Sequence, residues 1–382
     1  MKTILEGSRA VAETVKLCRP AVIAAYPITP QTVIVEALAK FVADGELKSK
    51  YLEVESEFSA ISACLGATAA GYRSFTATSS QGLELMHEVL FTTAGMRLPV
   101  VMVVANRAVS APINIWNDEQ DSISQRDTGW LQFYCESVQE VVDTLLQAYR
   151  IAEAHKVLLP VMVCMDGYYL THVVEPVDMP TQADVEKFLP AYKPEVYLDP
   201  QRPMTQGSLA YPSQYMIIRK QLADAVIGSM TVVKKAHDDF ARQFKRKYGD
   251  GLIEEYKNDK HAAIVALGSI CGTIKEAADR NKKFGLVRVR CFRPFPKDEV
   301  RKALKNKDLA IVIDRNISLG NSGALSMEVR DCMYDEGKKP KIVNYIVGLG
   351  GVDTSRKDIE QIVKDAKNRK DGEVVWWMKD NE

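Results

Sequence analysis

The sequence predicts an α/β protein built on doubly wound, mostly parallel sheets, and three observations lead to this prediction. Short apolar runs alternate with segments of helical period through residues 8–175. The same alternation begins again at residue 262 and continues to residue 348. A proline-rich segment separates the two stretches. Strands that alternate with helices form βαβ units, in which helices cover both faces of a parallel sheet.

In the first stretch, five apolar runs are expected to be strands, at residues 21–26, 51–54, 74–78, 100–104 and 160–165. Four segments with helical spacing are expected to be helices, at 33–43, 59–70, 84–94 and 138–154. In such sheets, ligands lie beyond the carboxyl ends of the strands. The loops of interest are therefore 27–31, 55–59, 79–83 and 106–121.

Residues 178–213 contain prolines at 180, 190, 194, 200, 203 and 212, so a connecting arm without regular structure is expected. A long, charged and mainly solvated helix is predicted at 214–248. Further strands are predicted at 262–267, 285–290, 309–314 and 342–347. The chain is thus expected to divide into a module at 1–177, an arm and helix at 178–259, and a second α/β domain at 260–382.

Composition argues against several classes of function. Lys plus Arg and Asp plus Glu both number 50, so no net charge attracts nucleic acid or an anionic membrane. The N-terminal MKTILEGSRA lacks the apolar core of a secretory signal, and no apolar run approaches the ~20 residues that cross a bilayer. These features favour a cytoplasmic protein that binds neither nucleic acid nor membrane.

The seven cysteines are scattered, and no two of them form a CxxC pair. This spacing supplies neither a zinc nor an iron–sulfur ligand set, and it suits core packing in a reducing compartment. Gly249-Asp250-Gly251 follows a charged stretch rather than an apolar strand, so it is predicted to be a turn. The sequence contains no GxGxxG, P-loop, HExxH or GxSxG arrangement.

The segment Tyr26-Pro27-Ile28-Thr29-Pro30 follows the first predicted strand. A threonine before proline is a good helix N-cap, so a cap is the simpler interpretation of Thr29. The alternative is functional, because the Thr29 hydroxyl would lie at the edge of the sheet where a substrate could meet it.

Three carboxylates, Glu53, Glu55 and Glu57, close the second predicted strand and lead into an apolar helix. They could simply favour the positive end of that helix. A carboxylate at the end of a parallel strand is also a common place for a group that transfers protons. The next loop, at residues 76–82, is rich in small hydroxyl side chains, as expected of a loop that lies close to a ligand.

The strongest single signal is Arg107, which follows the buried-strand pattern of residues 101–105. Its guanidinium suits bidentate binding of a carboxylate or phosphate, although a structural ion pair is an equal alternative. The mixed polar and aromatic loop at residues 110–121 comes next, and loops of this length inside a compact domain are usually functional.

Five motifs, taken together, resemble those of the alpha subunits of the pyruvate:ferredoxin oxidoreductase type, within the 2-oxoacid:ferredoxin oxidoreductases. They are YPITP, EVESE, TSSQGLELM, ANRAVSAPINIWNDEQD and Arg293-Pro294-Phe295-Pro296. The resemblance covers essentially the whole chain. It implies a thiamine diphosphate pyrimidine-binding module followed by a transketolase C-terminal-like domain. It also implies that a separate beta subunit holds the diphosphate and its Mg²⁺, and that iron–sulfur clusters lie in partner chains.

The resemblance assigns roles to three residues. Glu57 falls where the family's glutamate contacts the pyrimidine nitrogen N1′ and exchanges a proton with it. Arg107 falls where the family's arginine meets the pyruvate carboxylate. Thr29 falls where the threonine of PITP donates a hydrogen bond to the substrate. No metal ligand is expected in this chain.

The implied reaction is oxidative decarboxylation of pyruvate with coenzyme A, with electrons passed to ferredoxin. The implied partners are beta, gamma and delta subunits, and the active site is expected at a subunit interface. Branched-chain 2-oxoacid enzymes remain an alternative, because the sequence does not show whether Ile115 and Trp116 form a small pocket wall. Remoter alternatives are a beta-type subunit of an NAD-linked 2-oxoacid dehydrogenase and a non-catalytic scaffold.

Overall fold

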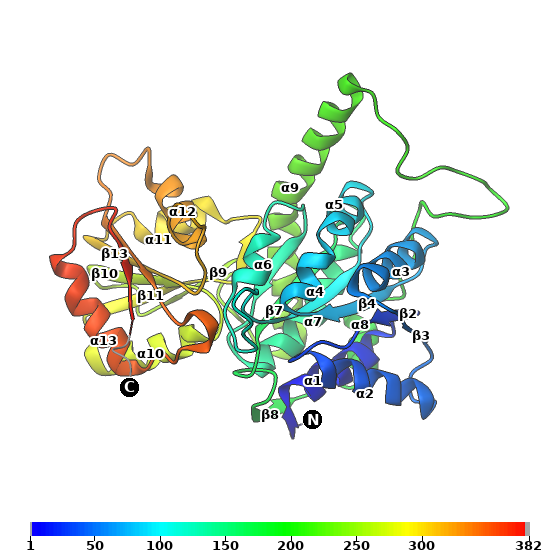
Figure 1. The fold of residues 1–382 in the computed structure, drawn as a ribbon, viewed down its shortest axis with the longest axis horizontal. Helices are drawn as coiled ribbons and strands as arrows, with labels where there is room; N and C mark the ends of the chain where they lie inside the picture. The colour runs from blue at the N-terminus through cyan, green and yellow to red at the C-terminus, as the bar shows by residue number, and fades with distance from the viewer. Residues whose placement is uncertain (1, 379–382) are drawn as a thin grey trace.

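The computed structural model describes residues 2–378 and contains two large sheets, each covered by helices on both faces (Figure 1). The blue-to-green part of the chain builds most of the sheet on the right of Figure 1, and the yellow-to-red part builds the sheet on the left and adds one short strand to the first. A small antiparallel pair joins β1 (Lys2–Glu6) to β8 (Val174–Asp178). The α/β prediction is therefore confirmed.

The first sheet has seven strands in the order β12-β6-β7-β5-β4-β2-β3. All its pairs are parallel except that of β12 with β6. The strands are β2 (Val22–Ala25), β3 (Lys50–Glu53), β4 (Ser74–Thr78), β5 (Val101–Asn106), β6 (Leu131–Tyr134), β7 (Val161–Asp166) and β12 (Cys291–Arg293).

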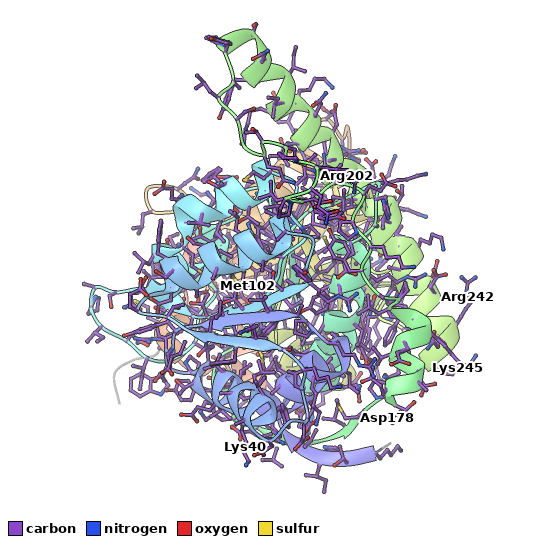
Figure 2. The ribbon with its side chains drawn as sticks, turned by 90° about the vertical axis from the view of Figure 1, so that its right-hand side faces the viewer. Lys40, Met102, Asp178, Arg202, Arg242 and Lys245 are labelled. Atoms are coloured by element: carbon purple, nitrogen blue, oxygen red, sulfur yellow. The ribbon has the colours of Figure 1, made fainter. Side chains whose placement is uncertain are left out.

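Strand β5 shows why the central strands are apolar runs without alternation. Val101 and Val103 pack on one side with α1 (Gly7–Cys18), α2 (Thr32–Ala43) and α7 (Val138–Ala152). Met102, labelled in Figure 2, and Val104 pack on the other side. The helices there are α3 (Glu57–Ala69), α4 (Ser80–Leu85), α5 (His87–Gly95) and α6 (Gln120–Ser124). Because both faces are buried, every position must be apolar.

The second sheet has six strands in the order β15-β14-β13-β10-β11-β9, and only β9 runs antiparallel to its neighbour. The strands are β9 (Ile253–Tyr256), β10 (Ala262–Ala266), β11 (Phe284–Val289), β13 (Leu309–Asp314), β14 (Lys341–Ile346) and β15 (Val374–Trp376). Its helices are α10 (Ile270–Asn281), α11 (Lys297–Leu304), α12 (Ala324–Met333) and α13 (Arg356–Asp365), with short 3₁₀ turns at Leu349–Gly351 and Ala366–Asn368.

Several local predictions were wrong. The helix predicted at 84–94 is two helices, since α4 ends at Leu85 and α5 begins at His87. The arm contains α8 (Gln182–Phe188), because a proline-free stretch there begins with a capping box between Thr181 and Asp184. The strands β6, β9 and β12, together with helix α1, were not predicted.

The long helix α9 runs from Pro212 to Phe244 rather than from 214 to 248, and it ends where Lys245 adopts a left-handed conformation. The prediction that it is mainly solvated holds for its first half only. In its second half Val233 and Phe240 are buried in the core of the first sheet, and in its first half Leu222 is buried there as well. The predicted turn is confirmed, since Gly249 and Gly251 both have positive φ between α9 and β9.

All seven cysteines are buried free thiols. Burial raises the pKa of Cys18 and of Cys64 to about 12, so these thiols stay protonated and unreactive at neutral pH. Across residues 2–378, no helix is long and apolar enough to cross a membrane.

Candidate active site

Four neighbouring strands of the first sheet direct their carboxyl ends to one edge. The strands β5, β4, β2 and β3 lie side by side and run parallel. Thr29 follows β2, Glu57 follows β3 and Arg107 follows β5. The structure therefore brings the three candidate residues to the same edge of the sheet.

Glu57 is the first residue of α3, after the N-cap Ser56, whose hydroxyl accepts a hydrogen bond from the Ser59 backbone N–H at 3.2 Å. The Glu57 side chain is only 6 % exposed. Among the hydrogen bonds and ion pairs within residues 2–378, none involves its carboxylate. The first turn of a helix favours a negative charge, but a buried carboxylate is costly without a donor. This carboxylate is suited to receive a donor from outside the chain.

Gly82, on the first turn of α4, allows the chain to approach Glu57 closely. A Cβ at this position would lie 2.5 Å from Glu57 Oε1 and 2.6 Å from Thr78 Oγ1. The Thr78 hydroxyl is itself buried and has no partner among the described residues. Two side-chain oxygens that lack partners among the described residues thus lie close to where a Cβ of residue 82 would stand, and any larger residue would move at least one of them.

We expect Gly82→Ala to displace the Glu57 carboxylate while leaving the fold intact. The atoms in the way are side-chain oxygens, which can move, rather than backbone. Activity of the assembled enzyme should fall at least about 10-fold if Glu57 has the role that the resemblance assigns to it, because a displacement of ~1 Å at a group that transfers protons can cost far more. Steady-state assays and thermal unfolding would measure both effects. The control is Gly95→Ala, since a Cβ there meets no atom within 4 Å.

Arg107 is 7 % exposed, and its guanidinium is held by backbone carbonyls. Nε donates to the Asn114 carbonyl at 2.9 Å, and Nη1 donates to the Thr29 carbonyl at 3.0 Å. No carboxylate within residues 2–378 forms an ion pair with it, so an ion pair inside this part of the chain does not account for its position. A buried, oriented guanidinium without a counter-ion is suited to bind an anion.

Asp121 fixes the backbone around Arg107, and the sequence analysis did not single it out. Its buried carboxylate accepts hydrogen bonds from the backbone N–H groups of Arg107 at 3.0 Å and Ser80 at 2.9 Å, and from Asn106 Nδ2 at 2.7 Å. Burial raises the pKa of Asp121 to about 7, although these donors act to lower it. The contacts join residues far apart in the chain, so no local pattern reveals them.

Thr29 is not the N-cap of α2. The helix begins at Thr32 with Gln31 at the N-cap position, and Thr29 lies exposed in the preceding turn. Gln31 is buried, and its Nε2 donates to the Ala77 carbonyl of β4 at 2.5 Å, which fixes this turn against the sheet. The Thr29 carbonyl holds Arg107, and the residue as a whole is exposed.

The loop at 110–119 connects the site to the second sheet. Asn114 Nδ2 donates to the Gly350 carbonyl at 3.0 Å, and the Gly350 N–H donates to Asp118 Oδ2 at 3.0 Å. Three apolar side chains of this loop remain exposed: Ile113 at 80 %, Ile115 at 38 % and Trp116 at 54 %. Within this chain, Ile115 and Trp116 therefore do not enclose a pocket wall. They offer apolar surface beside the buried Arg107.

The chain matches two family models. Residues 13–238 match the model described as pyruvate flavodoxin/ferredoxin oxidoreductase, thiamine diphosphate-binding. Residues 261–359 match the model described as pyruvate:ferredoxin oxidoreductase core domain II. The first matched region contains strands β2 to β7 of the first sheet, and the second contains β10, β11, β13 and β14 of the second sheet.

Full-length relatives give the same result. The chain is 53 % identical to pyruvate synthase subunit PorA of Methanocaldococcus jannaschii over 98 % of this chain and 97 % of that one. It is 48 % identical to PorA of Pyrococcus furiosus over 98 % and 96 % of the two chains. It is 43 % identical to ketoisovalerate oxidoreductase subunit VorA of Pyrococcus abyssi over 99 % and 98 %.

Solved structures with low identity support the fold alone. The 2-oxoglutarate:ferredoxin oxidoreductase of Magnetococcus marinus superposes with a TM-score of 0.71 at 19 % identity, over 96 % of this chain but only 65 % of that one. A split gene transketolase superposes with a TM-score of 0.56 at 12 % identity, over 96 % and 99 %. The expected pyrimidine-binding module and transketolase C-terminal-like domain are confirmed as the fold.

Proposed function

Because this chain belongs to the pyruvate flavodoxin/ferredoxin oxidoreductase family, we propose that it is the subunit that binds pyruvate and completes a thiamine diphosphate site. The overall reaction would convert pyruvate and coenzyme A to acetyl-CoA and CO₂ and pass electrons to ferredoxin, reversibly. Relatives named as pyruvate synthase subunits are 47–53 % identical, whereas ketoisovalerate subunits are 43 % identical. The difference supports pyruvate over a branched-chain 2-oxoacid.

The observation that carries the proposal is the guanidinium of Arg107. Two of its nitrogens are held by carbonyls of the chain, and Nη2 has no acceptor among residues 2–378. A small carboxylate that reaches this group gains a charge-assisted hydrogen bond in a mostly buried environment. The Thr29 carbonyl accepts a hydrogen bond from Arg107, and we propose that the Thr29 hydroxyl meets the 2-oxo group of the same substrate.

The residues at the edge of the sheet fit the pyrimidine end of thiamine diphosphate. When bound, the cofactor would supply a nucleophilic carbon for the 2-oxo carbon and a cationic ring as a sink for the electrons left by loss of CO₂. Glu57 offers a buried carboxylate without a partner, which would hold and move a proton at the pyrimidine N1′. Gly82 keeps α4 close enough to exclude water from one side of this carboxylate.

The rest of the site would come from partner chains. No group of three or more metal-ligating side chains occurs among residues 2–378. As the family resemblance implies, we assign the diphosphate, its Mg²⁺ and one iron–sulfur cluster to a beta subunit, with gamma and delta subunits completing a cytoplasmic complex. Three exposed aromatic side chains offer apolar surface for the beta subunit next to the buried Glu57 and Arg107. They are Tyr26, Phe58 and Trp116, which are 40 %, 40 % and 54 % exposed.

We also propose that three parts of the chain have separate roles. Residues 1–177 would form the pyrimidine-binding module, residues 178–259 an arm and connecting helix, and residues 260–382 the transketolase C-terminal-like domain. The hydrogen bonds from the loop at 110–119 to Gly350 support a positioning role for the last of these, since they tie that loop to the second sheet.

Replacing Arg107 with alanine tests the proposed function. Loss of a hydrogen bond to a charged group costs about 1.5–3 kcal/mol, so kcat/KM for pyruvate should fall roughly 10- to 150-fold in the assembled complex. The control is Arg97→Ala, because Arg97 also donates to backbone carbonyls, those of Val157 and Leu158, but lies before β5 at the opposite edge of the sheet. Its kinetics should match the wild type.

The same assay should compare pyruvate with a branched-chain 2-oxoacid. Pyruvate is expected to have the higher kcat/KM, and a reversed order would replace the proposed substrate with the branched-chain one. If the Arg107→Ala complex turned over pyruvate as fast as the wild type, this chain would instead be a non-catalytic scaffold.

A further inference from the structure

Asn114 connects Arg107 to the part of the chain that contains the second sheet. Its backbone carbonyl accepts the hydrogen bond from Arg107 Nε at 2.9 Å. Its side-chain Oδ1 accepts from the Trp116 backbone N–H at 2.7 Å, and its Nδ2 donates to the Gly350 carbonyl at 3.0 Å. The residue whose carbonyl holds Arg107 is therefore itself fixed from two sides, by its own loop and by the turn that follows β14.

The two side-chain contacts require an asparagine. A carboxamide has an acceptor oxygen and a donor nitrogen, and the two contacts use one of each. The contact from the side-chain oxygen to the N–H two residues later is an Asx turn, which fixes the local backbone. The neighbouring Ile113 and Ile115 are exposed, so polar contacts rather than apolar packing anchor this part of the loop. Aspartate would lose the donor, and alanine would lose both groups.

Two glycines allow the turn after β14 to approach the loop closely. We define the glycine turn as Leu349–Gly351, in which Gly350 and Gly351 have φ values of 61° and 87°. A Cβ on Gly350 would lie 2.6 Å from Asn114 Nδ2, and a Cβ on Gly351 would lie 2.4 Å from Trp116 Cβ. Both the backbone conformation and the available space therefore favour glycine. This close approach brings the Gly350 carbonyl within reach of the Asn114 side chain.

The end of the same loop fixes the glycine turn and the strand beside it. The Gly350 N–H donates to Asp118 Oδ2 at 3.0 Å, and Asp118 is buried. The Glu119 N–H donates to the carbonyl of Arg315, the residue after β13, at 2.9 Å. Backbone groups and a buried side chain make these contacts, so the loop and the glycine turn hold a fixed position relative to each other.

We propose that Asn114 is a positioning residue for Arg107, through which the glycine turn sets the affinity of the site for the substrate carboxylate. The inference rests on the proposed function, since it takes Arg107 as the group that meets this carboxylate. One of the two acceptors of Arg107 within residues 2–378 is the carbonyl of Thr29, on the first sheet's own loop. The other belongs to Asn114 and depends on the contact with Gly350. Because a guanidinium binds a carboxylate in a defined plane, its orientation decides how well it binds.

Asn114→Ala should change KM for pyruvate more than kcat in the assembled complex. Arg107 keeps its charge and loses only its orientation, so KM should rise about 5-fold, which is part of the cost of losing a charged hydrogen bond outright. The kcat should change less than about 2-fold. Exchange of the thiamine C2 proton, measured without pyruvate, should match the wild type, because the contacts of Asn114 do not include Glu57. A general loss of structure would instead lower kcat and slow this exchange together.

A second substitution tests the contact from the side of the glycine turn. Gly350→Ala places a Cβ against the Asn114 amide and should raise KM for pyruvate to a similar extent. In the Asn114→Ala background this amide is absent, so adding Gly350→Ala should raise KM no further. The control is Gly320→Ala, because Gly320 also has a positive φ, 86°, but a Cβ there meets no atom within 4 Å. Its KM should equal that of the wild type.

Three results would overturn the inference: an unchanged KM in Asn114→Ala, additive effects of the two substitutions, or a fall in kcat together with slow C2 exchange. The Arg107→Ala complex separates these results from a failure of the proposed function. If KM rises in Arg107→Ala but not in Asn114→Ala, only the positioning role is wrong. If neither variant changes the use of pyruvate, the proposed function itself is wrong.

Discussion

Replacing Glu57 with glutamine is expected to slow exchange of the thiamine C2 proton by about 10²- to 10⁴-fold in the assembled complex. Glutamine keeps the size and polarity of the side chain, so the turn beside Gly82 stays packed. It cannot give up or accept a proton at the pyrimidine N1′ as a carboxylate does. Pyruvate should still bind, since Arg107 is held by carbonyls of Asn114 and Thr29 and not by Glu57.

Deuterium exchange at C2, followed by NMR after rapid quenching, measures this effect directly. The matched control is Glu55→Gln, since Glu55 lies on the same segment but is exposed and bonded to Ser59. Fast exchange in the Glu57→Gln complex would show that another group exchanges the proton. Equal slowing in both variants would assign the effect to the charge of the whole segment.

The position of Arg107 could be predicted from the sequence because one local pattern determines it. Residues 101–105 are apolar at every position, which is typical of a central parallel strand, and the residue after such a strand lies at the ligand edge. The sequence could not decide between an anion site and an ion pair, since that depends on which carboxylates fold nearby. Among residues 2–378, the hydrogen-bond acceptors of this guanidinium are the backbone carbonyls of Asn114 and Thr29.

Other features of the site depend on contacts that have no local signature. Asp121 reaches Ser80 and Arg107 across a loop, and Gly82 matters only because α3 brings Glu57 against it. The threonine–proline pair at 29–30 did predict a cap, but Gln31, bonded to the neighbouring strand β4, moved the helix start to Thr32. Tertiary hydrogen bonds outweighed a local preference at that position.

The contacts that join the two sheets also could not be predicted from the sequence. Strand β12 is only three residues long, yet it crosses from the second stretch of the chain to pair with β6 of the first sheet. Just before it, Arg288 on β11 is 1 % exposed and forms ion pairs with Glu140 of α7, Glu136 and Glu254. Arg290 is also buried and bonds to Glu140.

Arg288→Met should destabilise the chain by about 3–5 kcal/mol at neutral pH, because removing one member of a buried ionic network leaves the others uncompensated. Glu136 and Glu254 would retain only Lys275, which is partly exposed. The loss in free energy of unfolding is measured by urea-induced unfolding, at the first transition. Arg9→Met is the control, since Arg9 pairs with Glu13 at the surface and should cost below about 1 kcal/mol.

The same network predicts how stability depends on pH. Burial acts to raise the pKa of Glu140, but Arg288 and Arg290 outweigh it and lower this pKa from 4.5 to about 2. A carboxylate with a lower pKa in the folded chain adds stability above pH 4.5, and that stability is lost as the pH falls toward 2. In Arg288→Met the pKa of Glu140 should rise toward 4.5. The free energy of unfolding of the variant should therefore fall less than that of the wild type between pH 4.5 and pH 2. If the two free energies fall equally with pH, Arg290 alone keeps the pKa of Glu140 low.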